Sequence, residues 1–184
     1  LYMTFYQQGV ENFKENNGYV IDDIWYPRVT SIVNIKAKPA LYRFYADLDN
    51  FAQGEEIKKR SADEGTRVHS AVEAILTGKD PVVDKDISPA VKEFREFVDE
   101  MNIQVEPEYV ERRVVNYSDR YAGTVDSVAL IDGKLGVLDI KTSSGIYRDY
   151  TLQLAAYFPP LQEQLRSLST RWILRIDHNQ ICNS

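Results

Sequence analysis

The dipeptide Asp132-Gly133 lies between two apolar segments, residues 121–131 and 134–141. Asp-Gly in this position is among the strongest short-range signals of a two-residue β-hairpin turn. With these two residues as the turn, the register of the paired strands brings Asp126 opposite Asp139. The hairpin therefore fixes where two carboxylates lie relative to each other.

Asp126 and Asp139 would then have Cβ atoms about 5 Å apart. Like charges so placed destabilise a sheet, and one carboxyl would resist ionising unless a positive charge lies between them. Lys141 comes two residues after Asp139, so it projects from the same face of its strand. Two acids and a lysine on an otherwise apolar sheet indicate a metal site, and such oxygen ligands suit Mg²⁺ or Mn²⁺. The alternatives are two solvated acids at a sheet edge and a lysine that only pairs with Asp139.

Both faces of the predicted hairpin are apolar, which is typical of a sheet covered by helices on both sides. Strict alternation places on one face Val125, Ala129 and Ile131, and on the other Val128, Leu130, Leu135 and Val137. The predicted fold class is α/β, with a mixed central β-sheet flanked by helices on both faces.

Helical and strand patterns extend along the 184 residues, which we expect to form a single domain (residues 1–184). Residues 1–100 are predicted to be mostly helical, and residues 101–184 to hold the sheet and a C-terminal helix. The expected helices cover residues 4–16, 40–50, 55–76, a segment from Ser88, and residues 152–158, where Pro159-Pro160 ends the helix before helical structure resumes at 161–168. The expected strands cover residues 19–26, 104–116, 121–131, 134–141 and 171–177.

Three short motifs follow one another around the hairpin: Gly123-Thr-Val-Asp126, Asp139-Ile-Lys141-Thr142 and Gln153-Leu-Ala-Ala-Tyr157. Their order resembles the PD-(D/E)XK nuclease superfamily, in its RecB-type exonuclease branch. Upstream, Gly65-Thr-Arg-Val-His69 resembles the helical histidine motif of that branch. Tyr26-Pro-Arg-Val-Thr-Ser-Ile32 resembles a segment of the mitochondrial genome maintenance exonucleases and related phage nucleases. The resemblance covers residues 26–176.

This resemblance implies a restriction-endonuclease-like core and a metal-dependent DNA exonuclease (a phosphodiester hydrolase). Its cofactor would be Mg²⁺ or Mn²⁺, and its partner single-stranded DNA or DNA with free ends, in replication, recombination or repair. Two alternatives stay open: a structure-specific endonuclease on the same fold, and a catalytically silent DNA-binding module. The intact acids and lysine argue against the silent module.

The resemblance also implies residue roles at the metal. Asp126, Asp139, the main-chain carbonyl of Ile140 and His69 would be the ligands. Lys141 would orient the attacking water and stabilise charge on the phosphate. Glu111 would hold a second cation or position the water, although a surface glutamate is the simpler interpretation. A histidine on an apolar helix face is also often a core residue, which is the alternative for His69.

Further residues are expected to contact DNA. Gln153 and Tyr157 share one helix face, and the resemblance implies that both contact phosphate or the lysine region; ordinary helix packing is the alternative. Thr142 would donate a hydrogen bond to a phosphate, although hydroxyl side chains at strand ends are common. Arg28 and Arg67 lie near the motifs and are candidate strand contacts, whereas most such charges are simply solvated.

Composition sets broader limits. A net charge of −6 argues against non-specific coating of nucleic acid but not against a local basic groove. No apolar run is long enough to span a membrane, and no secretory signal is visible, so we expect an intracellular protein without a membrane partner. The chain begins with Leu1 and is compatible with a truncated fragment. The single cysteine, Cys182, excludes an iron–sulfur cluster on four cysteines. The pattern does not predict an oligomeric state.

Overall fold

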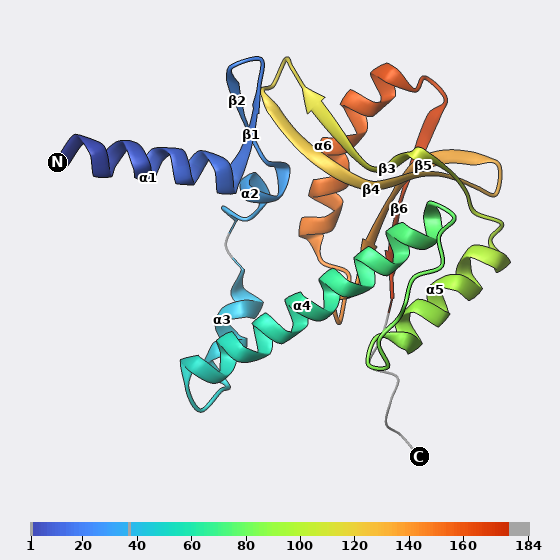
Figure 1. The fold of residues 1–184 in the computed structure, drawn as a ribbon, viewed down its shortest axis with the longest axis horizontal. Coiled ribbons are helices and arrows are strands. Elements are labelled where there is room, and N and C mark those ends of the chain that lie inside the picture. The colour runs from blue at the N-terminus through green and yellow to red at the C-terminus, as the bar shows by residue number, and fades with distance from the viewer. Residues whose placement is uncertain (1, 37, 177–184) are drawn as a thin grey trace.

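The computed structural model describes residues 2–36 and 38–176, and it shows an α/β protein built on a mixed four-stranded sheet (Figure 1). The strand order is β3-β4-β5-β6. The bounds of these strands are Gln104–Asn116 for β3, Tyr121–Ile131 for β4, Lys134–Lys141 for β5 and Leu168–Arg175 for β6. The predicted strands at 104–116, 121–131 and 134–141 are confirmed. The last strand begins earlier than predicted, and Asp177, its expected end, lies outside the described residues.

The turn between β4 and β5 is the predicted one. Asp132 has a φ of 50° and Gly133 a φ of 71°, as a two-residue hairpin with both central residues in the left-handed region requires. The antiparallel pairing runs from Ile131–Lys134 to Ser127–Leu138 in the predicted register. β5 and β6 are parallel, because α6 (Arg148–Gln164) crosses over between them.

A second hairpin replaces the single strand predicted at residues 19–26. β1 (Gly18–Ile21) and β2 (Ile24–Pro27) pair through a turn at Asp22-Asp23. Both aspartates have positive φ, 50° and 61°, a conformation that Asp tolerates better than most residues. The single-strand prediction failed because it passed over Asp22-Asp23, two turn-forming residues that interrupt the apolar run.

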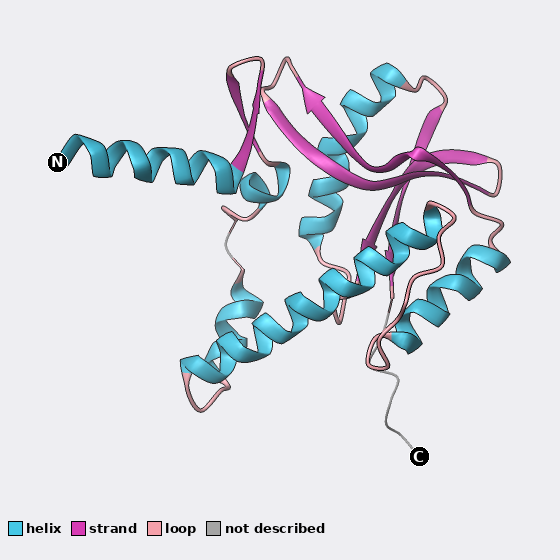
Figure 2. Cartoon of the chain, in the orientation of Figure 1, coloured by secondary structure: helices cyan, strands magenta, loops and turns pink. Residues whose placement is uncertain are grey.

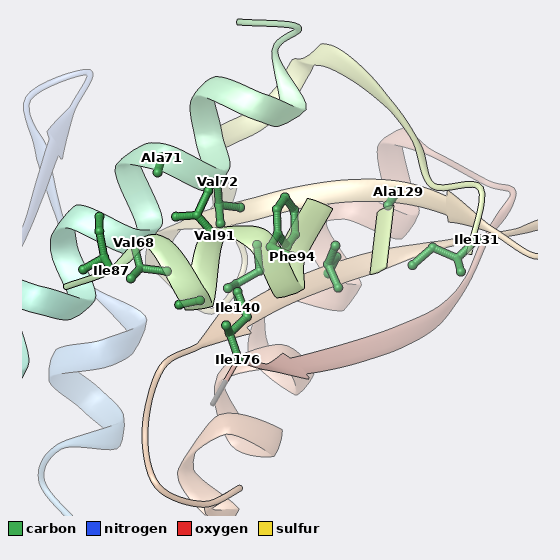
Figure 3. Packing of buried hydrophobic residues seen from close by; sticks show 12 residues of the cluster. Val68, Ala71, Val72, Ile87, Val91, Phe94, Ala129, Ile131, Ile140 and Ile176 are labelled. Carbon is green, nitrogen blue, oxygen red and sulfur yellow. The ribbon is translucent and has the colours of Figure 1, made fainter. Parts of the chain in front are cut away.

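Helices cover both faces of the sheet (Figures 1 and 2). α4 (Phe51–Leu76) and α5 (Ser88–Glu100) pack on one face, and Figure 3 shows their side chains meeting those of the sheet. α2 (Val29–Val33) and α6 pack on the other. The first core cluster contains Val68, Val72, Val91, Phe94, Ala129, Leu138 and Ile140, and the second contains Val29, Val125, Val128, Val137, Leu154, Tyr157 and Leu161.

Strict alternation fails at one place in β4. Val125 was predicted to share a face with Ala129 and Ile131, but it packs in the second cluster with Val128, while Ala129 and Ile131 pack in the first. The pairing of β4 with β3 is also irregular, with a register shift between Val105 and Val110. This irregularity lies next to the residues of the candidate site.

α6 is one continuous helix, so the predicted break at Pro159-Pro160 is wrong. Pro160 has no N–H to donate to the carbonyl of Ala156, four residues earlier. The hydroxyl of Tyr121 donates to that carbonyl instead, at 2.9 Å, and itself accepts from Asn116 Nδ2 at 2.9 Å. A tyrosine from β4 therefore replaces the missing helical donor, which sequence periodicity does not reveal.

The two remaining helices, α1 and α3, come from the N-terminal part of the sequence. α1 (Tyr2–Asn17) projects away from the sheet, as Figure 1 shows, and α3 (Pro39–Ala46) packs against the first half of α4. α4 begins four residues before its predicted start because the side chain of Asn50 accepts from Gln53 N at 2.9 Å and caps it. No helix in the described part of the chain has the length and apolar character needed to cross a membrane.

Candidate functional site

Asp139 lies near the end of β5 and is almost completely buried, with 1% of its surface exposed. Lys141 Nζ lies 2.8 Å from its Oδ2 and donates to its Oδ1 at 3.0 Å, and Gln153 Nε2 donates to the same Oδ1 at 3.2 Å. Although Lys141 opposes the shift, burial and the charge of Asp126 raise the pKa of Asp139 to about 6. Its Oδ2 touches the lysine but receives no well-directed hydrogen bond. A buried carboxylate oxygen therefore remains poorly satisfied.

Asp126 contacts β5 through its side chain. Its Oδ2 accepts the backbone N–H of Ile140 at 2.7 Å, which places this oxygen within about 5 Å of the Asp139 Cα. His69 Nδ1 lies 3.9 Å from the same oxygen. Asp126 thus contacts a residue of α4, whereas Asp139 contacts Gln153 of α6. The regular pairing of β4 with β5 keeps the predicted register and ends at Ser127–Leu138, one pair before the two acids, so their position directly opposite each other stays a prediction.

Ile140, which follows Asp139 in β5, belongs to the first core cluster. Its side chain is 1% exposed and packs in the first cluster, and its N–H is used by Asp126. The main-chain carbonyl is therefore the group of Ile140 that matters for the predicted metal site.

A cleft of about 460 Å³ opens beside Asp126 and is lined by His69, Glu73, Glu111, Thr142 and neighbours on α4. Glu111 has a φ of 50°, an uncommon conformation for a residue that is neither Gly, Asn nor Asp. Partial burial of its carboxyl, followed by repulsion from Asp126 and Glu73, raises the pKa of Glu111 to about 7. Glu111 as a residue is still exposed, so solvent screens part of this repulsion. The described residues that line this cleft include two glutamates and no Lys or Arg.

Thr142, which follows β5, and His69 of α4 both line this cleft. A Cβ at Gly65 would lie 2.9 Å from Thr142 Oγ1, so the glycine lets α4 approach the end of β5 closely. The structure therefore brings the predicted GxxxH segment and the end of the DIKT segment into contact.

Gln153 and Tyr157 lie on the inner face of α6. Gln153 Nε2 lies 3.2 Å from the hydroxyl of Tyr157, whose residue is only 2% exposed. Burial raises the pKa of Tyr157. A Cβ at Gly123 would lie 2.4 Å from a ring carbon of Tyr157, so the ring fills the space that this glycine leaves. The predicted direct contact of Tyr157 with DNA does not fit a buried ring; Tyr157 instead holds Gln153 in place.

The two predicted DNA-contacting arginines have partners within the protein. Arg67 pairs with Asp84 and Asp86 in the segment that precedes α5. Arg28 lies with its guanidinium 5.1 Å from the centre of the Tyr19 ring, and its buried Nε has no hydrogen-bond partner. Both side chains therefore already have contacts within the protein, and a contact of either with DNA remains a prediction.

Two neighbours of the site were not predicted. Tyr150 lies under Lys141, with Nζ 5.0 Å from its ring centre. Glu73 lines the cleft one helical turn after His69. The i,i+4 spacing of Glu73 from His69 and the i,i+3 spacing of Tyr150 from Gln153 are the sequence signals that would have found them.

Among residues 2–36 and 38–176, no group of three or more His, Cys, Asp or Glu side chains is arranged to hold a metal ion. No protein-family model matches this chain, and a search of curated proteins gave no significant match. The family resemblance stays a prediction that rests on the motifs and on their meeting in space.

Proposed function

We propose that this chain is a metal-dependent deoxyribonuclease with a restriction-endonuclease-like core, which hydrolyses phosphodiester bonds of single-stranded DNA or DNA ends. The observation that carries the proposal is the buried pair of Asp139 and Lys141, held by Gln153 of α6 and flanked by Asp126. Residues from three motifs that are separate in sequence thus converge at one place. Buried ionisable groups with shifted pKa values cluster at functional sites, which favours this place as the active site.

The residues present fit a hard divalent cation. Mg²⁺ is commonly bound through one or two carboxylates and keeps several waters, so it does not need three acidic side chains. Asp139 Oδ2 is a buried oxygen without a directed donor, and the surrounding carboxylates repel one another. Asp126, Asp139 and the carbonyl of Ile140 would hold Mg²⁺ or Mn²⁺, with His69 beside them. When bound, the ion supplies Lewis-acid stabilisation of the phosphate and lowers the pKa of a bound water.

The protein's own groups then have distinct tasks. Lys141 is fixed between Asp139 and the ring of Tyr150, so its charge is already oriented before a phosphate arrives. Gln153 keeps the Asp139 carboxylate in one rotamer through Oδ1. Glu111 lines the same cleft as His69 and would position the attacking water, and Thr142 would donate to a phosphate oxygen there.

The test is cleavage of end-labelled single-stranded DNA with Mg²⁺ or Mn²⁺ and with EDTA. We expect cleavage that requires the metal and that falls by at least about 100-fold in Lys141→Ala, because a preorganised cation at the phosphate is removed. Lys134→Ala is the matched control, since Lys134 lies at the exposed start of the same strand. Circular dichroism verifies that both variants fold.

Cleavage that persists in EDTA, or equal rates in Lys141→Ala and Lys134→Ala, would refute the proposed chemistry. Circular single-stranded DNA separates the two modes of attack, because an exonuclease that needs an end leaves it intact. Binding without cleavage under every metal condition would favour the silent DNA-binding module.

A further inference from the structure

A larger cavity, of about 560 Å³, adjoins the candidate site. One wall comes from α2, α3 and the residues between them, and the other from the first turns of α6. Gln153 lines this cavity and also donates to Asp139. Tyr150 lines it as well, and Lys141 Nζ lies 5.0 Å from the centre of its ring. A molecule bound in the cavity is thus separated from the buried ion pair by a single layer of side chains.

Aromatic side chains face this cavity from both walls. Phe44 comes from α3, and Tyr147 and Tyr150 come from the start of α6, where their rings meet edge to face at 5.6 Å. Tyr147 keeps 46% of its surface exposed. The volume is in the range of sites that enclose a small organic group, and its walls suit a flat ring.

The rim of the cavity is positively charged, although the whole chain has a net charge of −6. Lys36, Lys38 and Arg148 contribute three positive charges, and Asp149 contributes one negative charge. Lys36 Nζ lies 3.0 Å and Lys38 Nζ 3.7 Å from Asp149, and both lysine side chains are about two-fifths exposed, at 44% and 40%. They remain accessible to an anion from solvent. An aromatic interior with a cationic rim is complementary to a nucleotide, which joins a flat base to a phosphate.

We propose that this cavity binds one unpaired base of a single-stranded nucleic acid, with the adjoining backbone phosphates at Lys36, Lys38 and Arg148. The inference rests on the proposed function, because the strand would continue from this cavity to the site at Asp139 and Lys141. A base that is paired in a duplex must leave its stack to enter, which costs a few kcal/mol in general. The cavity therefore selects single strands over duplexes.

The test is fluorescence anisotropy in EDTA, so that binding is measured without cleavage. The probes are a short oligothymidine, an abasic strand of equal length and charge, and a duplex. The wild-type protein should bind the oligothymidine more tightly than the abasic strand. The ratio of the two dissociation constants should fall by roughly 5- to 150-fold in Phe44→Ala, which corresponds to about 1–3 kcal/mol for one stacked base.

Tyr147→Ala should show the same loss, and Tyr147→Phe should keep the ratio. Tyr42→Ala is the matched control, because Tyr42 is an aromatic residue on the same helix as Phe44, is 67% exposed and does not line the cavity. Circular dichroism verifies folding, and the exposed Tyr147 provides a second variant if Phe44→Ala unfolds. The same strands with ribose identify the preferred sugar. Base dependence that is present in the wild-type protein and lost in Phe44→Ala supports the proposal with either sugar.

Three results would overturn the proposal. The first is equal affinity of the wild-type protein for the oligothymidine and the abasic strand. The second is the same ratio of these two dissociation constants in Phe44→Ala and Tyr42→Ala, and the third is a loss of duplex binding in Phe44→Ala equal to its loss of oligothymidine binding. The last two would mean that the aromatic wall does not take up a base. The nuclease assay fails separately from this one. A protein that never cleaves but shows the predicted base dependence refutes only the proposed function, and one that cleaves without base dependence refutes only this inference.

Discussion

Replacing Asp139 by Asn should make the metal-free protein more stable at neutral pH. The ordinary pKa of 3.8 rises to about 6 for Asp139 in the fold, chiefly because the carboxyl is buried. Between these two values the folded protein holds a proton that the unfolded chain has released. The stabilisation that Asp139 gives is therefore complete below pH 3.8 and is lost as the pH rises through 6.

The size of the effect follows from that difference. One pH unit corresponds to about 1.4 kcal/mol, so the ionised Asp139 lowers the free energy of unfolding at pH 7 by about 3 kcal/mol. Asn mimics the protonated carboxyl, but its amide N–H groups need acceptors that the site does not provide. We therefore expect Asp139→Asn to be about 1–3 kcal/mol more stable than the wild-type protein at pH 7, and the gap to close toward pH 4.

Urea denaturation in EDTA, repeated between pH 4.5 and pH 7.5, measures this gap. Asp132→Asn is the matched control, because Asp132 is exposed in the hairpin turn and its positive φ suits Asn equally well. It should change stability by less than about 0.5 kcal/mol at every pH. A destabilised Asp139→Asn variant at pH 7, or a gap that does not depend on pH, would contradict this account of the buried carboxylate.

Two further substitutions probe how α6 is held. Tyr121→Phe should lower the free energy of unfolding, measured by urea denaturation, by about 1 kcal/mol because it removes the donor to the Ala156 carbonyl. The loss should be smaller in a Pro160→Ala background, where a helical N–H is restored, and equal losses in both backgrounds would count against the interpretation. Gly123→Ala should cost about 1–3 kcal/mol, because the new Cβ would lie 2.4 Å from the Tyr157 ring. Gly9→Ala in α1, with nothing within 4 Å, is its control, and equal stability changes in the two variants would show that the ring yields easily.

The hairpin was predictable from sequence because its turn chemistry is local. Asp132-Gly133 needs only its own two φ angles, and the strands on either side follow from it. The meeting of Asp139, Lys141 and Gln153 was anticipated only through the motif order. Nothing in residues 148–157 alone shows which side chain of α6 reaches the sheet.

The failures have two physical causes. The Asp22-Asp23 turn is local, and its two aspartates interrupt the apolar run that was predicted as one strand. The continuous helix through Pro159-Pro160 depends on a distant partner that periodicity does not encode. Tyr121, 35 residues away in sequence, donates to the Ala156 carbonyl that Pro160 leaves without a helical donor. Similarly, the break in the alternation of β4 between Val125 and Val128 accompanies an irregular pairing with β3, which alternation alone does not reveal.

Gly65 has a consequence for anyone who transplants this histidine into another scaffold. His69 follows it by four residues, about 6 Å along the helix axis and on the same side. Because Thr142 Oγ1 occupies the space beside the glycine, the size of residue 65 sets how closely α4 approaches the end of β5. A bulkier residue there would lift the helix off the strand end, and the imidazole would no longer reach Asp126. The glycine and the histidine must therefore be moved as one unit.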